Sequence, residues 1–276
     1  MDHIDDYELE IETLTENYAL EEDLEYLSAL ETFFAPIRKV MEKYDYEHEE
    51  AALEATETGY SEKRTNPVFI VLTEGESPLS PIIKKATNSP YSHACITFNL
   101  AMNPIYSFGT NKVNDRFNIP TGTGFVKTSP EANIWGGANN GSSAVKYGVF
   151  VTHVSDKELK QMNQRLEYFI NNADKMTFNV IGLARNYFQK PSPKKLSWFC
   201  SGFVAEILGQ GRKLSKDSTL YSPADLSNIN YVKFIYKGNN IMKHDAKALG
   251  KAYLSFLKKE KARMSRTKEA LKKKKK

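Results

Sequence analysis

Cysteine is scarce in this chain, because only Cys95 and Cys200 occur among its 276 residues. So few cysteines exclude a disulfide-rich scaffold and leave open a single bridge between the two. Long apolar runs are also missing, which excludes a transmembrane helix. The first residues, "MDHIDDYELE", lack the basic and apolar regions of a signal peptide. We therefore expect a cytoplasmic protein, or one that is carried in a particle.

Positive charge is absent from the first part of the chain and concentrated at its end. No Lys or Arg stands between Met1 and Ile37, whereas the last residues read "KEALKKKKK". The two ends could neutralise each other, or the Lys-rich tail could bind nucleic acid or another anionic surface. A solvated tail that only improves solubility is the interpretation we favour, because no nucleic-acid recognition motif accompanies the charge.

The pattern of residues divides the chain into three parts. Residues 1–66 read as an acidic helical arm and linker, in which Leu20, Leu24 and Leu27 recur at helical spacing. Residues 241–276 read as a basic helical tail. Between them, residues 67–240 mix strands and helices without regular alternation, which indicates an α+β fold. Both arms are candidate surfaces for assembly with partners, through residues 1–60 and 241–276.

The central part predicts a series of short elements. Strands are expected at 68–75, 91–100, 104–110, 146–154 and 230–238, and short helical segments at 78–87 and 222–226. Ser155 and Glu158 form the pattern of a capping box at the start of a longer helix. A second helix follows Cys200 and is expected to stop at Gly209 and Gly211. The glycine-rich stretch 122–143 reads mainly as loops.

The stretch "LSWFCSGFVAEIL" places Cys200 where an apolar run turns into a helix. A helix start favours a thiolate, and the backbone N–H of Cys200 could donate to a substrate carbonyl. A cysteine nucleophile also needs a histidine as its base. Strand alternation places His93, Cys95 and Thr97 on one face, and His93 is the histidine best suited to that role. The simpler interpretation is that Cys200 is a core residue, since free cysteine is commonly buried.

Five segments support a family resemblance. "SPYSHACITF", "IYSFGT", "GFVKT", "FCSGFVAEIL" and "YSPADL", in this order, resemble the circularly permuted papain-fold cysteine hydrolases of the NlpC superfamily, the YiiX-like group. The resemblance covers residues 67–238. It implies a permuted papain-like domain with a small antiparallel sheet, in which Cys200 is the nucleophile and His93 the base.

The resemblance is less direct at the third catalytic position. Many members carry an acidic residue on the strand after the histidine, and here that position holds Ser107. We predict that Ser107 accepts a hydrogen bond from His93, with Asn99 and Tyr106 as alternatives. An uncharged serine stabilises an imidazolium less than a carboxylate would. The predicted substrate-binding residues are Tyr91, whose hydroxyl could serve the oxyanion, Asn99 and Trp198.

The leading hypothesis is a thiol hydrolase, an amidase or peptidase acting on cell-wall peptides, that needs no cofactor and no metal. The alternative is a non-catalytic structural component of a larger assembly, such as a phage virion, that keeps the papain-like fold. Acyl transfer on a lipid is a third hypothesis. A zinc site formed by His93, Cys95, His153 and Cys200 has suitable ligand types but lacks compact spacing.

Overall fold

The computed structural model describes residues 64–75, 80–114, 119–130, 144–179, 190–191 and 196–274. Most of the predicted acidic arm, residues 1–63, therefore lies outside the described residues. Residues 66–256 form one compact unit, and the rest of the C-terminal helix, from Leu257, belongs to a second unit.

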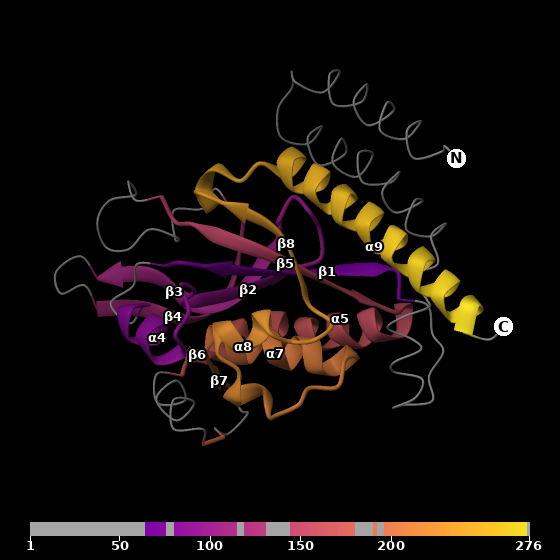
Figure 1. The fold of residues 1–276 in the computed structure, drawn as a ribbon. Helices are drawn as coiled ribbons and strands as arrows, with labels where there is room; N and C mark the ends of the chain where they lie inside the picture. The colour runs from indigo at the N-terminus through magenta and orange to yellow at the C-terminus, as the bar shows by residue number, and fades with distance from the viewer. Residues whose placement is uncertain are drawn as a thin grey trace, which may run out of the picture. The chain divides into compact units, whose positions relative to one another are not determined.

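An antiparallel sheet of six strands is the centre of the compact unit (Figure 1). Its strands are β1 (Asn66–Thr73), β2 (His93–Thr97), β3 (Ile105–Asn114), β4 (Ile119–Thr128), β5 (Tyr147–Val154) and β8 (Lys233–Gly238). They lie in the order β4-β3-β2-β1-β5-β8, and every neighbouring pair is antiparallel. A separate parallel pair joins β6 (Thr177–Phe178) to β7 (Ser197–Trp198).

The helices are α4 (Ser80–Thr87), α5 (Asp156–Asn171), α7 (Cys200–Gly211), α8 (Pro223–Ser227) and α9 (Ala246–Lys274). Short 3-10 turns occur at η1 (Ala173–Lys175), η2 (Ser218–Leu220) and η3 (Ile241–Lys243). The predicted α+β class with an antiparallel sheet is confirmed. No helix among these is long and apolar enough to cross a membrane, as far as the described residues extend.

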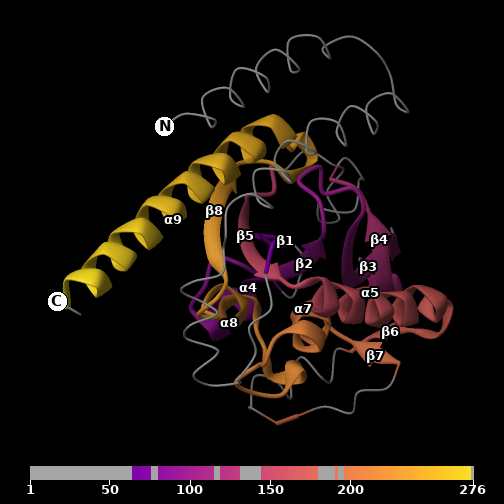
Figure 2. The ribbon, with the colours of Figure 1, turned by 90° about the vertical axis from the view of Figure 1, so that its right-hand side faces the viewer.

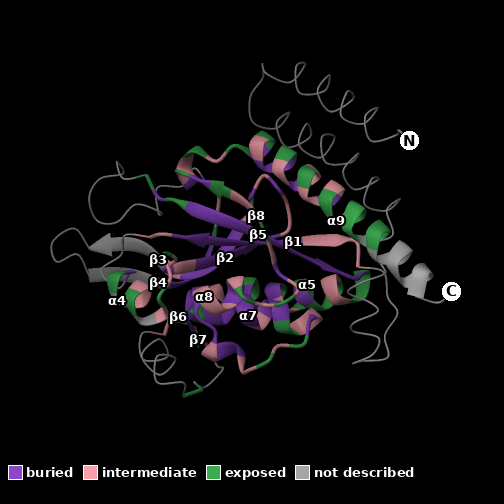
Figure 3. Ribbon diagram, in the orientation of Figure 1, coloured by how far each residue is buried: buried purple, intermediate pink, exposed green. Residues whose placement is uncertain are grey.

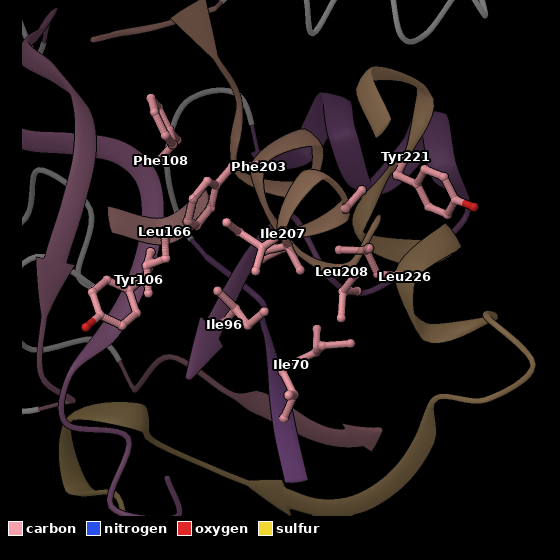
Figure 4. Packing of buried hydrophobic residues seen from close by; sticks show 14 of the residues in the cluster. Ile70, Ile96, Tyr106, Phe108, Leu166, Phe203, Ile207, Leu208, Tyr221 and Leu226 are labelled. Carbon is pink, nitrogen blue, oxygen red and sulfur yellow. The ribbon is translucent and has the colours of Figure 1, made fainter. Parts of the chain in front are cut away.

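One face of the sheet packs on α5 and α7 (Figure 2). Its core includes Ile70 and Ile96 from the sheet and Phe203 and Ile207 from α7 (Figure 4). Burial of these side chains supplies the main favourable free energy of this layer.

The opposite face of the sheet is covered by the first turns of α9. Tyr253 packs edge-on against Phe69, with ring centroids 5.5 Å apart, and its hydroxyl lies 2.8 Å from His153 Nε2. Because both faces are covered, the apolar residues of β1 from Val68 onward are all buried, as Figure 3 shows for the central strands. The apolar run of β1 thus reflects a strand between two layers.

Local signals in the sequence predict several element boundaries correctly. Ser155 accepts a hydrogen bond from the Glu158 N–H, and the Glu158 carboxylate accepts one from the Ser155 N–H, which completes the predicted capping box of α5. Ser222 caps α8 in the same way, with Pro223 in the first turn. Cys200 begins α7, as predicted.

Two predictions were wrong in their extent. The glycine-rich stretch begins with a strand, because β4 covers Ile119–Thr128 and pairs with β3, which itself continues to Asn114. His93 is the first residue of β2 and does not stand in the interior of that strand. The end of α7 agrees with the prediction, because the helix continues through Gly209 and ends at Gly211.

Candidate active site

The candidate site lies at the first turn of α7. Phe199 precedes the helix with an extended backbone, φ −116° and ψ 162°, and its phenyl ring has no oxygen with which to cap the helix. The first N–H groups of a helix have no partners within the helix itself. Cys200, the first residue of α7, is only 4% exposed. Its thiol therefore lies beside backbone donors that favour negative charge.

Strand β2 runs beside this helix end. The backbone N–H of Ala94 donates a hydrogen bond to the Cys200 sulfur, which lowers the pKa of the thiol. Ala94 directly follows His93, so the predicted nucleophile and the predicted base come from adjoining parts of the fold. Alternation along β2 turns Ala94 toward α7 and turns the side chains of His93 and Cys95 toward the other face of the sheet.

Ser107 on β3 holds the imidazole of His93. The Ser107 Oγ lies 3.0 Å from His93 Nε2 and donates to the Ala94 carbonyl oxygen at 2.7 Å. A hydroxyl has one hydrogen, so toward His93 this oxygen accepts. The neutral imidazole accordingly carries its proton on Nε2, and its Nδ1 keeps the basic lone pair. Ser107 thus contacts His93 as the sequence predicts, and its catalytic role stays a prediction.

Burial makes both predicted catalytic groups neutral at neutral pH. Loss of solvation raises the pKa of Cys200 to about 11, although the nearby backbone and Ser201 donors oppose this shift. Burial lowers the pKa of His93 to about 4. With these pKa values the thiol of Cys200 and the imidazole of His93 do not form a thiolate–imidazolium pair at neutral pH.

Tyr91 lies on the α7 side of the sheet, against β5. Its ring packs edge-on against Phe150 with centroids 6.1 Å apart, and its hydroxyl occupies the space that a side chain at Gly148 would need. Burial raises its pKa, and the carboxylate of Glu74 raises it further. These contacts describe a packed tyrosine, and the predicted oxyanion role stays untested.

The other predicted residues are not brought to Cys200. Asn99 follows the far end of β2, where its amide donates to the Asn103 carbonyl at 2.8 Å and stabilises the turn toward β3. Trp198 is buried in the core, with its ring 5.4 Å from that of Phe169. Tyr106 faces the core on the opposite side of β3 from Ser107, so Ser107 alone of the three alternatives contacts His93.

Both cysteines lie among the described residues, and both are free thiols, so the bridge that the sequence left open is absent. Cys95 is fully buried beside Ser107, and burial raises its pKa. His153 lies on β5 against Tyr253. Within the part of the chain that the structure describes, no group of three or more His, Cys, Asp or Glu side chains could hold a metal ion.

The two residues after Cys200, Ser201 and Gly202, are both buried. A Cβ at Gly202 would meet the Phe199 ring at 3.1 Å, so the glycine makes room for that ring. The Ser201 hydroxyl lies beside the Cys200 sulfur. The one sequence signal for this serine is its position directly after the cysteine at a helix start.

His244, which lies between η3 and α9, is held by two hydrogen bonds. Its Nε2 lies 3.0 Å from the Leu100 carbonyl oxygen and its Nδ1 lies 2.9 Å from the Tyr147 hydroxyl. These bonds use both ring nitrogens of His244.

Comparison with known proteins found no matching family model, no matching curated protein and no matching solved structure.

Proposed function

We propose that this protein is a thiol hydrolase that cleaves an amide bond through an acyl-enzyme at Cys200. On this proposal residues 67–240 form a permuted papain-like domain. The observation that carries it is the position of Cys200, at the first turn of α7 and hydrogen-bonded to the residue that follows His93. Ser107, which holds the His93 imidazole, supports the same assignment.

The proposed reaction starts from a neutral thiol and a neutral imidazole. His93 Nδ1 takes the thiol proton while the sulfur attacks the amide carbonyl, whose π electrons move to its oxygen. When the C–N bond breaks, the imidazolium returns the proton to the leaving amine. Water then attacks the thioester, with His93 again as base, and releases the acid and the free thiol.

The geometry sets two conditions on this reaction. His93 starts on the other face of β2, so its ring must turn about the side-chain bonds at the end of the strand to bring Nδ1 to Cys200. The ring that turns toward Cys200 leaves the Ser107 hydroxyl, so Ser107 holds the resting imidazole and no carboxylate stabilises the imidazolium. We therefore expect slow turnover compared with enzymes that have an acidic third residue.

Specific observations favour a second candidate function, a non-catalytic component of a larger assembly. The thiol of Cys200 is buried with a raised pKa, and the His93 side chain faces away from α7. Such a protein would keep the papain-like domain as a rigid body. The acidic arm and the basic tail would then bind its partners, and the tail would bind nucleic acid or another anionic surface.

The test compares Cys200→Ala with Cys95→Ala, since both replace a buried free cysteine. The full-length protein is incubated with soluble cell-wall stem peptides and simple peptide amides, and the products are followed by mass spectrometry. We expect Cys200→Ala to lower the rate by about 10³-fold or more, because the nucleophile is lost. Cys95→Ala should keep the parent rate.

Acid quenching during turnover should also trap an acyl group on the peptide that contains Cys200. Equal rates in the two cysteine variants, or turnover without that adduct, would rule out the hydrolase. If the parent protein cleaves none of these amides and its thiol titrates as an ordinary buried cysteine, the structural component becomes the better conclusion.

A further inference from the structure

The hydroxyl of Ser201 is buried and has no hydrogen-bond partner among the residues that the structure describes. Ser201 is the second residue of α7 and is 1% exposed. Its Oγ makes no hydrogen bond with any residue that the structure describes. Buried hydroxyls nearly always have a partner, because losing their hydrogen bonds to water without replacement costs free energy. An exception of this kind calls for a functional explanation.

This hydroxyl lies in the group of donors that surrounds the Cys200 sulfur. A thiolate at Cys200 would accept hydrogen bonds from four donors: the backbone N–H groups of Ala94, Cys200 and Ser201, and the Ser201 hydroxyl. The three N–H groups belong to the backbone, and only proline, which would also disturb the strand or the helix, removes such a group. The Ser201 hydroxyl is therefore the donor that a conservative substitution can delete.

The charge of the sulfur decides whether the hydroxyl has a partner. A neutral thiol is a weak acceptor, whereas hydrogen bonds to an ionised group are shorter and about twice as strong as neutral ones. The Ser201 hydroxyl is thus poorly satisfied in the resting state and becomes satisfied when Cys200 loses its proton. The arrangement favours the charged state at some cost to the neutral one.

We propose that Ser201 is a further catalytic residue, whose hydroxyl donates a hydrogen bond to the Cys200 sulfur while that sulfur carries negative charge. The proton that leaves the thiol goes to His93 Nδ1, and the hydroxyl keeps its own hydrogen throughout. This inference rests on the proposed nucleophilic function of Cys200, but it concerns thiol ionisation, which can be measured without any substrate.

For Ser201→Ala we expect a slower alkylation of Cys200 together with an unchanged or higher stability of the fold. Loss of a hydrogen bond to a charged group should raise the pKa of Cys200 by about one unit or more. At a fixed pH below that pKa, the thiolate fraction and the rate of alkylation should fall about tenfold. The urea midpoint of unfolding should stay the same or rise, because a buried hydroxyl without a partner is removed.

The experiment measures alkylation of Cys200 by iodoacetamide at fixed pH, with peptide mass spectrometry, and urea unfolding of the same samples. Ser218→Ala is the matched control, because Ser218 is also buried, 3% exposed, but donates to Glu206 at 2.8 Å. That control should lower the urea midpoint and leave the alkylation rate of Cys200 unchanged. Ser201→Thr, which keeps the hydroxyl, should alkylate at the parent rate.

An unchanged alkylation rate in Ser201→Ala overturns the inference. A slower rate with a lower urea midpoint also overturns it, because a disturbed helix start would explain both. His93→Ala separates this inference from the proposed function. If that variant alkylates like the parent while Ser201→Ala is slow, the His93–Cys200 pair fails and the Ser201 hydrogen bond stands.

Discussion

At the scale of single residues, Ser107 links two parts of the candidate site. Its hydroxyl donates to the Ala94 carbonyl at 2.7 Å and accepts from His93 Nε2 at 3.0 Å, so one oxygen bonds to two consecutive residues of β2. Ala94 in turn donates its N–H to the Cys200 sulfur. The orientation of His93 and the position of residue 94 beside Cys200 therefore depend on the same side chain.

Replacement of Ser107 by Ala should remove the hydrogen bond that holds Nε2 of the His93 imidazole. The Nε2–H and the Ala94 carbonyl each lose a partner, so we expect the free energy of unfolding to fall by about 1–3 kcal/mol. Nitrogen NMR of His93 should show a mixture of tautomers where the parent shows the Nε2–H form. Ser92→Ala is the control, because Ser92 is also buried beside His93 but bonds to the Gly75 carbonyl, at 3.3 Å. A single unchanged tautomer in Ser107→Ala would contradict this assignment.

At the scale of elements, β4 shows how a glycine-rich segment becomes a strand. Gly124 stands opposite Gly109 in the register of β3 and β4. A Cβ at Gly124 would collide with the backbone oxygen of Met176, which follows η1. The missing side chain therefore allows β4 to approach the η1–β6 segment closely, and pairing with β3 offsets the entropy that glycine loses in a strand.

Because of this close approach, we expect alanine to destabilise the fold more at Gly124 than at Gly109, the glycine that faces it on β3. Gly124→Ala should lower the free energy of unfolding by about 1–3 kcal/mol, because backbone must move to accept the methyl group. Gly109→Ala should have little effect, since its Cβ would meet His93 Cε1 at 3.5 Å, an ordinary contact. Urea unfolding of both variants checks the prediction, and equal losses in the two would show that the Met176 contact is not the cause.

At the scale of the whole molecule, the sheet carries two histidines whose pKa values the fold lowers, the buried His153 and the partly exposed His93. Burial lowers the pKa of His93 to about 4, and burial together with the Arg212 charge lowers that of His153 to about 3. His153 stacks on Tyr253 and Phe256, and its carbonyl oxygen accepts from Arg212 at 3.2 Å. Protonating His153 places a charge between the sheet and the first turns of α9.

These lowered pKa values set the sign of the pH dependence. In the unfolded chain a histidine binds a proton near pH 6.5, whereas in the fold His93 does so near pH 4 and His153 near pH 3. The contribution of these neutral histidines to the free energy of unfolding is therefore complete above about pH 6.5, and it is lost as the pH falls toward those two values. For His93 alone the loss amounts to about 3 kcal/mol. His153→Phe keeps the ring packing but removes the titrating group. In urea unfolding between pH 7 and pH 4, the free energy of unfolding of this variant should therefore fall less steeply with decreasing pH than that of the parent. A slope equal to that of the parent would argue against a neutral, buried His153.

Much of the local structure could be predicted from the sequence alone. The apolar run of β1, the capping boxes at Ser155 and Ser222, and the helix that starts at Cys200 all depend on neighbours within a few residues of the chain. Such short-range preferences are readable from residue order. The candidate pair Cys200 and His93 was also accessible, because the residue types and their order indicate the chemistry.

The tertiary structure alone decided the features that depend on burial and on register. The strand β4 forms because β3 pairs with it, and Ser107 meets His93 because β3 lies beside β2 in one register. The neutral state of Cys200 follows from its loss of solvation, and the Ser201 hydroxyl lacks a partner among the described residues only because packing removes water from it. Desolvation and strand register are set by residues far apart in the chain, which is why residue order by itself does not contain them.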